Sequence, residues 1–145
     1  MAVIFVTGGA GYIGSHLCAL LSMGGHLPVA YDDLSGGTLA AVRWGPVVLG
    51  DLADRPRLDE ALALYRPEVV VHLAAARGAE AAQRRARDLG GSLALVEAMQ
   101  AQAIDRLVFA SSAAAAEPAA EVKRVVERML QDADAAHGIR SVALR

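Results

Sequence analysis

A glycine-rich turn directly after a β-branched run constrains the fold of this chain more than any other feature. Residues 3–6 (VIFV) predict a buried strand, and T-G-G-A-G-Y-I-G follows it without a break at residues 7–14. Three glycines recur there at a spacing of three: Gly8, Gly11 and Gly14. In a strand–turn–helix unit, the first such glycine permits the tight turn, the second admits a phosphate close to the backbone, and the third lets the helix pack against the sheet. The segment therefore predicts a helix whose N-terminal N–H groups can bind an anion.

An acidic residue at the end of the second predicted strand indicates which kind of ligand carries that anion. Residues 28–31 (PVAY) predict this strand, and Asp32 follows it, 18 residues after Gly14. In a dinucleotide-binding βαβ unit, a carboxylate at this place accepts hydrogen bonds from the adenosine ribose, whereas NADP needs room for a 2′-phosphate. The pattern favours NAD over NADP. The alternative is a glycine turn and a surface aspartate without a ligand.

Short β-branched runs alternate with helical stretches along the whole chain. The expected strands are residues 3–6, 28–31, 46–49, 69–73, 107–110 and 141–144. Because they are apolar on both faces, they are typical of a parallel sheet covered on both sides, and right-handed crossovers favour a doubly wound topology. We expect one α/β domain over residues 1–145, a doubly wound Rossmann fold with about six parallel strands and helices on both faces.

Each of the four helical stretches between these strands carries apolar side chains at helical spacing. The four sets are Ile13, Leu17, Leu20 and Leu21; Leu58, Ala61, Leu62 and Tyr65; Leu89, Leu93 and Val96; and Val122, Val125, Val126, Met129 and Leu130. Asp54 is expected to cap the second helix. Gly90 and Gly91 should weaken the third by about 1 kcal/mol each relative to alanine.

Charge and composition exclude several classes of function. The 145 residues hold 14 basic and 16 acidic side chains without a block of one sign, which argues against an electrostatic nucleic-acid binder. No apolar run approaches the length of a membrane span, and the glycines that follow residues 1–6 argue against a signal peptide. Cys18 is the one cysteine, so an intrachain disulfide is excluded, and no His and acidic residues share metal-ligand spacing. We expect a cytoplasmic protein with no metal site and no membrane partner.

Six segments, in this order, carry a resemblance to a known family. They are T-G-G-A-G-Y-I-G-S-H, Y-D-D-L-S-G-G, G-D-L-A-D, V-V-V-H-L-A-A-A, L-V-F-A-S-S-A and A-A-H-G-I-R-S-V-A-L-R. Together the segments resemble the N-terminal half of the UDP-glucose 4-epimerase family, which are extended short-chain dehydrogenases/reductases. The resemblance implies a tightly held NAD that accepts a hydride from the sugar C4 and returns it.

The resemblance also implies roles for individual residues. The pyrophosphate would lie against Gly8, Gly11, Tyr12, Ile13 and Gly14. The adenosine ribose would meet Asp32, Asp33, Ser35 and Gly36, and the adenine would lie between Asp51 and Leu52. Beyond the fourth strand the cofactor would be lined by Leu73, Ala74 and Ala75, with Arg77 near the nicotinamide ribose. The catalytic positions would be Ser112 and Lys123.

The departures from the family pattern bear on activity. The family's proton-carrying tyrosine would stand four residues before Lys123, where this chain has Ala119. The segment from Ser112 to Ala119 is shorter than the family's, as is the region after His72, and Asp88 stands where an asparagine is expected. The sequence ends at Arg145, where the family's UDP-sugar domain would begin. We therefore expect an NAD(H)-binding domain without epimerase turnover and with UDP-sugar binding unlikely, either a trimmed chain or an unusual natural fragment.

Several alternatives stay open from the sequence. His72 is more typical of a hydrogen-bonded core histidine than of a base, Cys18 of a packed thiol than of a reactive one, and Ser112 could simply cap a loop. Lys123 could contact the nicotinamide ribose or be solvated. The stripe Val122, Val126 and Met129 could face the sheet or a second copy, and we expect a monomer or weak homodimer. Two other functions remain: an epimerase completed by a partner chain, and a scaffold without cofactor.

Overall fold

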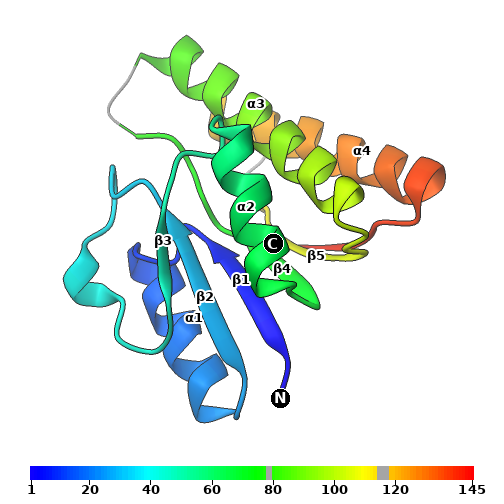
Figure 1. The fold of residues 1–145 in the computed structure, drawn as a ribbon. Coiled ribbons are helices and arrows are strands. Elements are labelled where there is room, and N and C mark those ends of the chain that lie inside the picture. Colours follow the sequence, from blue (N-terminus) through cyan, green and yellow to red (C-terminus); the bar gives the residue numbers. More distant parts are fainter. Residues whose placement is uncertain (78–79, 114–117) are drawn as a thin grey trace.

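A computed structural model describes residues 1–77, 80–113 and 118–145, and in it the chain forms a six-stranded parallel sheet with helices on both faces (Figure 1). The strands are β1 (Val3–Thr7), β2 (Leu27–Asp32), β3 (Val47–Leu49), β4 (Val69–His72), β5 (Arg106–Ala110) and β6 (Arg140–Leu144). The helices are α1 (Tyr12–Met23), the short 3-10 helix η1 (Leu39–Ala41), α2 (Arg55–Tyr65), α3 (Ala81–Ala101) and α4 (Pro118–His137). The strand order is β3-β2-β1-β4-β5-β6, which confirms the expected doubly wound Rossmann topology.

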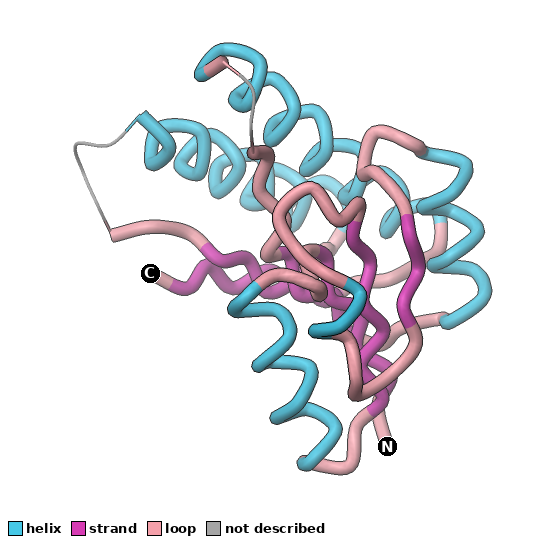
Figure 2. Tube along the Cα trace, turned by 90° about the vertical axis from the view of Figure 1, so that its left-hand side faces the viewer, coloured by secondary structure: helices cyan, strands magenta, loops and turns pink. Residues whose placement is uncertain are grey.

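The direction of the crossovers decides which face each helix covers. The chain leaves β1 toward β2 by way of α1, whereas α2, α3 and α4 lead in the other direction, toward β4, β5 and β6. Right-handed crossovers in opposite directions lie on opposite faces. Figure 2 accordingly shows the strands between α1 and the longer helices.

The larger part of the core lies between the sheet and α2, α3 and α4. Its buried residues include Phe5, Val70 and Phe109 from the strands and Leu62 and Leu95 from the helices. A smaller cluster lies under α1: Ile4, Val6, Cys18 and Val71. Burial raises the pKa of the Cys18 thiol to about 11, so this cysteine is a packed side chain rather than a reactive one.

The apolar stripe expected on α1 is wrong in part. Ile13 and Leu20 are 67% and 66% exposed, and the buried positions of the helix are Gly14 and Cys18. A Cβ on Gly14 would lie 2.1 Å from the Gly8 carbonyl oxygen, so this glycine must face the turn. Because that contact fixes the rotation of the helix about its axis, Ile13 points to solvent.

Two other stripe positions also lie outside the core. Leu93 is 46% exposed on α3 and Val125 is 50% exposed on α4. On α4, Val122, Val126 and Leu130 are buried at a spacing of four, so Val125 is rotated about 100° from Val126 and about 60° from Val122, toward solvent. Met129 is half-buried against the same core. The stripe of Val122, Val126 and Met129 therefore packs inward, not toward a second copy.

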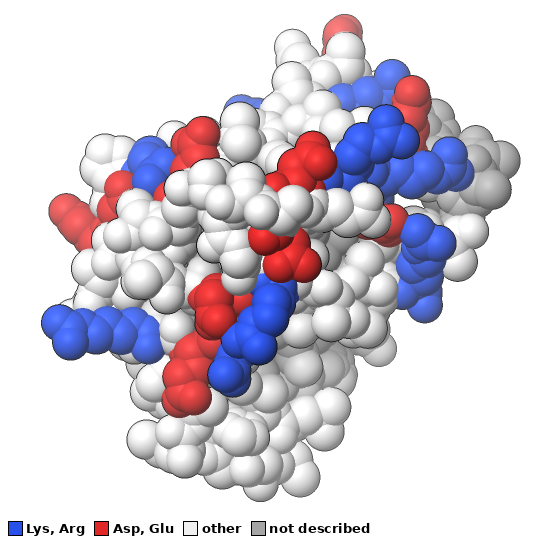
Figure 3. All heavy atoms as spheres, turned by 90° about the vertical axis from the view of Figure 1, so that its right-hand side faces the viewer, with Lys and Arg blue, Asp and Glu red and all other residues white. Residues whose placement is uncertain are grey.

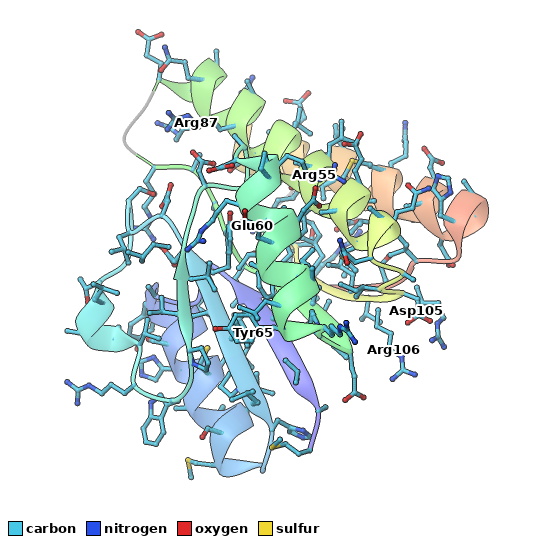
Figure 4. The ribbon with its side chains drawn as sticks, viewed as in Figure 1. Arg55, Glu60, Tyr65, Arg87, Asp105 and Arg106 are labelled. Atoms are coloured by element: carbon cyan, nitrogen blue, oxygen red, sulfur yellow. The ribbon has the colours of Figure 1, made fainter. Side chains whose placement is uncertain are left out.

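A cap and ion pairs fix the start of α2, which packs beside α3 on the same face of the sheet. The Asp54 carboxylate accepts the Arg57 N–H at 3.2 Å, which confirms the expected N-cap. Arg55 lies between the two helices (Figure 4), with Asp59 of its own helix at 2.9 Å and Glu97 of α3 at 3.1 Å. These contacts hold the first turn of α2 against the C-terminal half of α3.

Acidic and basic side chains are interspersed on the face shown in Figure 3. Among the described residues, no helix is long and apolar enough to cross a membrane.

Candidate functional site

The glycine turn joins β1 to α1 as the spacing predicts. Gly8 has φ +72°, a conformation that favours glycine, and its N–H donates to the Tyr31 carbonyl oxygen at 2.9 Å. Gly14 packs its Cα against the turn, and Gly11 is the N-cap of α1. The helix begins at Tyr12, so the N–H groups of its first turn have no partner within the helix. They form a site of positive potential at the C-terminal ends of the parallel strands.

The carboxylate of Asp32 supports this turn from the neighbouring strand. One oxygen accepts the Ala10 N–H at 2.9 Å, and the other accepts the Leu34 N–H at 2.8 Å. The side chain is buried, with the residue 8% exposed, and lines the groove beside the turn. Each carboxylate oxygen can accept a second hydrogen bond. Asp32 can therefore hold the turn and still accept a ribose hydroxyl.

The residues expected at the adenosine end lie together at the ends of β2 and β3. Asp33, Ser35, Gly36, Asp51 and Leu52 all line the same groove. Two of the carboxylates stabilise their own turns: Asp33 accepts the Ser35 N–H at 2.8 Å, and Asp51 accepts the Ala53 N–H at 2.9 Å.

Tyr31 supports the loop after β3 at this end of the groove. Its hydroxyl donates to the Asp51 carbonyl oxygen at 2.9 Å, and a Cβ on Gly50 would lie 2.4 Å from that hydroxyl. Burial, with the nearby Asp54 and Asp51, raises the pKa of Tyr31 to about 12, so this phenol keeps its proton. The close approach of loop and ring requires glycine at position 50.

The groove continues across the sheet to the end of β4, with a volume of about 140 Å³. Its far wall is the segment Leu73, Ala74, Ala75, Ala76 and Arg77, together with Arg87 and Asp88 of α3. Figure 4 shows Arg87 on the first half of α3. A Cβ on Gly36 would lie 2.7 Å from Arg77 Cδ, so the Arg77 side chain, which was expected near the nicotinamide ribose, reaches across the groove to the loop after β2.

A buried hydrogen-bonded histidine fixes the floor of the groove. His72 Nδ1 lies 2.7 Å from Thr7 Oγ1, and His72 Nε2 lies 2.9 Å from Ser92 Oγ. The ring stacks on Phe109, with centroids 5.6 Å apart. Burial, and secondarily the positive charge of Lys123, lowers the pKa of His72 to about 4. His72 is a neutral structural link between β1, β4 and α3, as the sequence favoured.

A second cavity of about 160 Å³ adjoins the groove. Both are lined by residues 72–76 and Asp88; the second also reaches Phe109 and Lys123. Lys123 donates to the Ala110 carbonyl oxygen at 2.9 Å, so it is anchored to the end of β5 rather than freely solvated.

The remaining expected site residues contribute less to these cavities. The side chains of Tyr12 and Ile13 are exposed, so only their backbone N–H groups are available to the groove. Ser112 is half-buried just beyond β5, and the side chain of Ala119 lies outside the described residues. The neighbouring Ser111, which the sequence did not single out, donates its hydroxyl to the Glu127 carboxylate.

Asp88 and Arg87 are the charged residues lining the groove that the sequence does not assign to the site. From the sequence, Asp88 stands out only as a departure from an expected asparagine. The signal that could have found Asp88 is its position, one helical turn before Ser92 on the face toward the sheet. Within the described ranges, no group of three or more His, Cys, Asp or Glu side chains could hold a metal ion.

The comparisons with known proteins agree with this geometry. Residues 4–145 match the family model described as "NAD dependent epimerase/dehydratase family". The chain belongs to this family. A UDP-glucose 4-epimerase of Rhizobium leguminosarum bv. trifolii is 37% identical over 98% of this chain and 50% of its own length. Its alignment is 164 positions long, so the relative carries about 22 positions that this 145-residue chain lacks.

Solved structures of family members superimpose closely. The Brucella ovis UDP-glucose 4-epimerase in complex with NAD is 35% identical with a TM-score of 0.93, covering 100% of this chain and 51% of the other. The Thermus thermophilus UDP-glucose 4-epimerase complex with NAD is 28% identical with a TM-score of 0.90, covering 99% and 54%. The chain thus spans about half the length of the relatives it matches.

Proposed function

We propose that this chain is a minimal NAD(H)-binding domain. The observation that carries the proposal is the juxtaposition of the open N-terminus of α1 with the Asp32 carboxylate across one groove. The helix end supplies N–H donors for the pyrophosphate, and the carboxylate supplies acceptors for the ribose. Family members that superimpose on the whole chain are described in complex with NAD, which supports the same assignment.

The residues present fit this cofactor. The α1 turn needs glycine at positions 8 and 14, because a side chain at position 8 would collide with the backbone after β4 and one at position 14 with the turn itself. Four acids of the groove (Asp32, Asp33, Asp51 and Asp88) outnumber its two arginines (Arg77 and Arg87) among the described residues, which disfavours the additional phosphate of NADP. When bound, NAD would supply hydride acceptance; the protein's own part is to hold the two halves of the molecule at the ends of β2 and β4.

We propose further that residues 1–145 do not turn over a UDP-sugar. The family's tyrosine position holds Ala119, and a methyl side chain cannot carry a proton. Lys123 donates to the backbone of β5 instead of to a phenol. The proposal includes a monomer or weak homodimer, because the stripe on α4 is buried in the core. It also includes a cytoplasmic location, on the ground that the chain has a single cysteine.

Calorimetric titration with NAD⁺ and fluorescence titration with NADH test the binding proposal. Saturable binding by the wild type is expected, and it should be lost in Gly14→Val, whose side chain collides with the turn. Gly90→Ala is the matched control, because nothing lies within 4 Å of a Cβ there. No saturable signal up to millimolar concentrations of either form would refute the proposal. Absence of UDP-galactose to UDP-glucose interconversion tests the lack of turnover.

A further inference from the structure

Asp88 occupies a distinctive place between the two cavities. It projects from α3, lines both cavities, and accepts the Ala76 N–H at 2.6 Å with one carboxylate oxygen. The positive charges of Lys123 and Arg84 act on it from α4 and from its own helix. The carboxylate is thus held by the loop after β4 and faces two cations.

The strand order separates Asp88 from the other acids of the groove. Asp32, Asp33 and Asp51 follow β2 and β3, on one side of the glycine turn at the end of β1. Asp88 lies on the opposite side, beside the residues that follow β4. Among the described residues that line the second cavity, it is the one acid, and three cations share that cavity: Arg84, Arg85 and Lys123.

A dinucleotide held by its adenosine at β2 and by its pyrophosphate at β1 extends toward β4 and β5. Its nicotinamide end then lies on the side of Asp88 and Lys123. The oxidised nicotinamide ring carries a positive charge that the reduced ring lacks, whereas the phosphates and the adenosine are the same in both forms. A charge on this side of the groove therefore acts differently on NAD⁺ and NADH.

We propose that Asp88 is a specificity-determining residue that favours the oxidised over the reduced cofactor by offsetting the cations around the nicotinamide end. The inference rests on the proposed function and adds to it a preference for one redox state. An asparagine at this position could still accept the Ala76 N–H but would remove the negative charge that faces Lys123 and Arg84.

The experiment compares affinities of purified wild type and Asp88→Asn for NAD⁺, NADH and ADP-ribose by isothermal titration calorimetry at one pH and ionic strength. In the variant the ratio Kd(NADH)/Kd(NAD⁺) should fall about tenfold, the size of one charge interaction at several ångströms in a partly solvated site. Asp51→Asn, an acid of the same groove at the adenosine end, should leave the ratio unchanged. Lys123→Gln removes a cation from the same cavity and should shift the ratio in the opposite direction, toward NAD⁺.

The outcomes separate the two proposals. An unchanged ratio in Asp88→Asn, or an equal change for NAD⁺, NADH and ADP-ribose, would overturn the inference while leaving NAD(H) binding intact. Failure of the wild type to bind all three ligands would refute the proposed function and this inference with it. If Asp88→Asn does not fold, Lys123→Gln decides: a shift toward NADH, or no shift, contradicts the charge argument.

Discussion

Lowering the pH should destabilise the folded chain through His72, and the loss of unfolding free energy follows from its lowered pKa. The buried imidazole, hydrogen-bonded to Thr7 and Ser92, has a pKa lowered from 6.5 to about 4. Below pH 6.5 the unfolded chain binds a proton at this residue and the folded chain does not, so stability present at pH 7.5 is lost as the pH falls toward 4. Linkage gives a loss of about 2 kcal/mol by pH 5 and about 3 kcal/mol by pH 4.

The assay is urea unfolding of cofactor-free wild type and His72→Gln between pH 7.5 and pH 5. Carboxylates such as Asp105 and Glu127, whose pKa values are lowered by hydrogen bonds from Arg140 and Arg145, lose stability with acid in both proteins. Because this carboxylate contribution is the same in both proteins, it cancels when their free energies of unfolding are subtracted. Wild type should lose about 2 kcal/mol more than the glutamine variant over this range. Parallel pH profiles, or an NMR titration showing His72 protonated above pH 6, would refute the reasoning.

Four further substitutions test other contacts. Gly14→Ala should lower the unfolding midpoint sharply and abolish NADH binding because its Cβ would lie 2.1 Å from the Gly8 carbonyl oxygen; Gly90→Ala, with open space around its Cβ, should instead stabilise by up to about 1 kcal/mol in the same denaturation assay. Asp32→Ala should weaken NAD⁺ affinity by about 1–3 kcal/mol in calorimetry, since it leaves polar partners unpaired; an unchanged Kd contradicts the ribose assignment. Asp54→Ala should cost about 1 kcal/mol of unfolding free energy by loss of the α2 cap, without altering cofactor affinity.

Asp32 and Asp88 are two carboxylates of one groove that make the same kind of contact with the backbone. Both accept backbone N–H groups, Asp32 from the glycine turn and Asp88 from the loop after β4. Each therefore fixes the chain that would surround a ligand while keeping acceptor capacity for it. Burial raises the pKa of the Asp88 carboxyl above the ordinary aspartate value.

Local patterns in the sequence determined the elements and the centre of the site. The spacing of Gly8, Gly11 and Gly14 predicts the turn because a tight turn and close helix packing need glycine wherever they occur. The β-branched runs predict the six parallel strands for a similar reason, since strands buried on both faces must be apolar throughout. Asp32 at the end of the second run could be placed beside the turn because consecutive parallel strands end at the same edge of the sheet.

Only the tertiary structure decided how the helices are rotated and what meets at the far end of the groove. Ile13 points to solvent because the contact of Gly14 with the turn selects one rotation of α1, and Val125 does so because α4 buries Val122 and Val126 instead. The pairing of His72 with Ser92, the reach of Arg77 to Gly36 and the position of Asp88 between two cavities join residues from separate elements. Spacing along one helix or strand carries no information about such neighbours, because packing between elements brings them together.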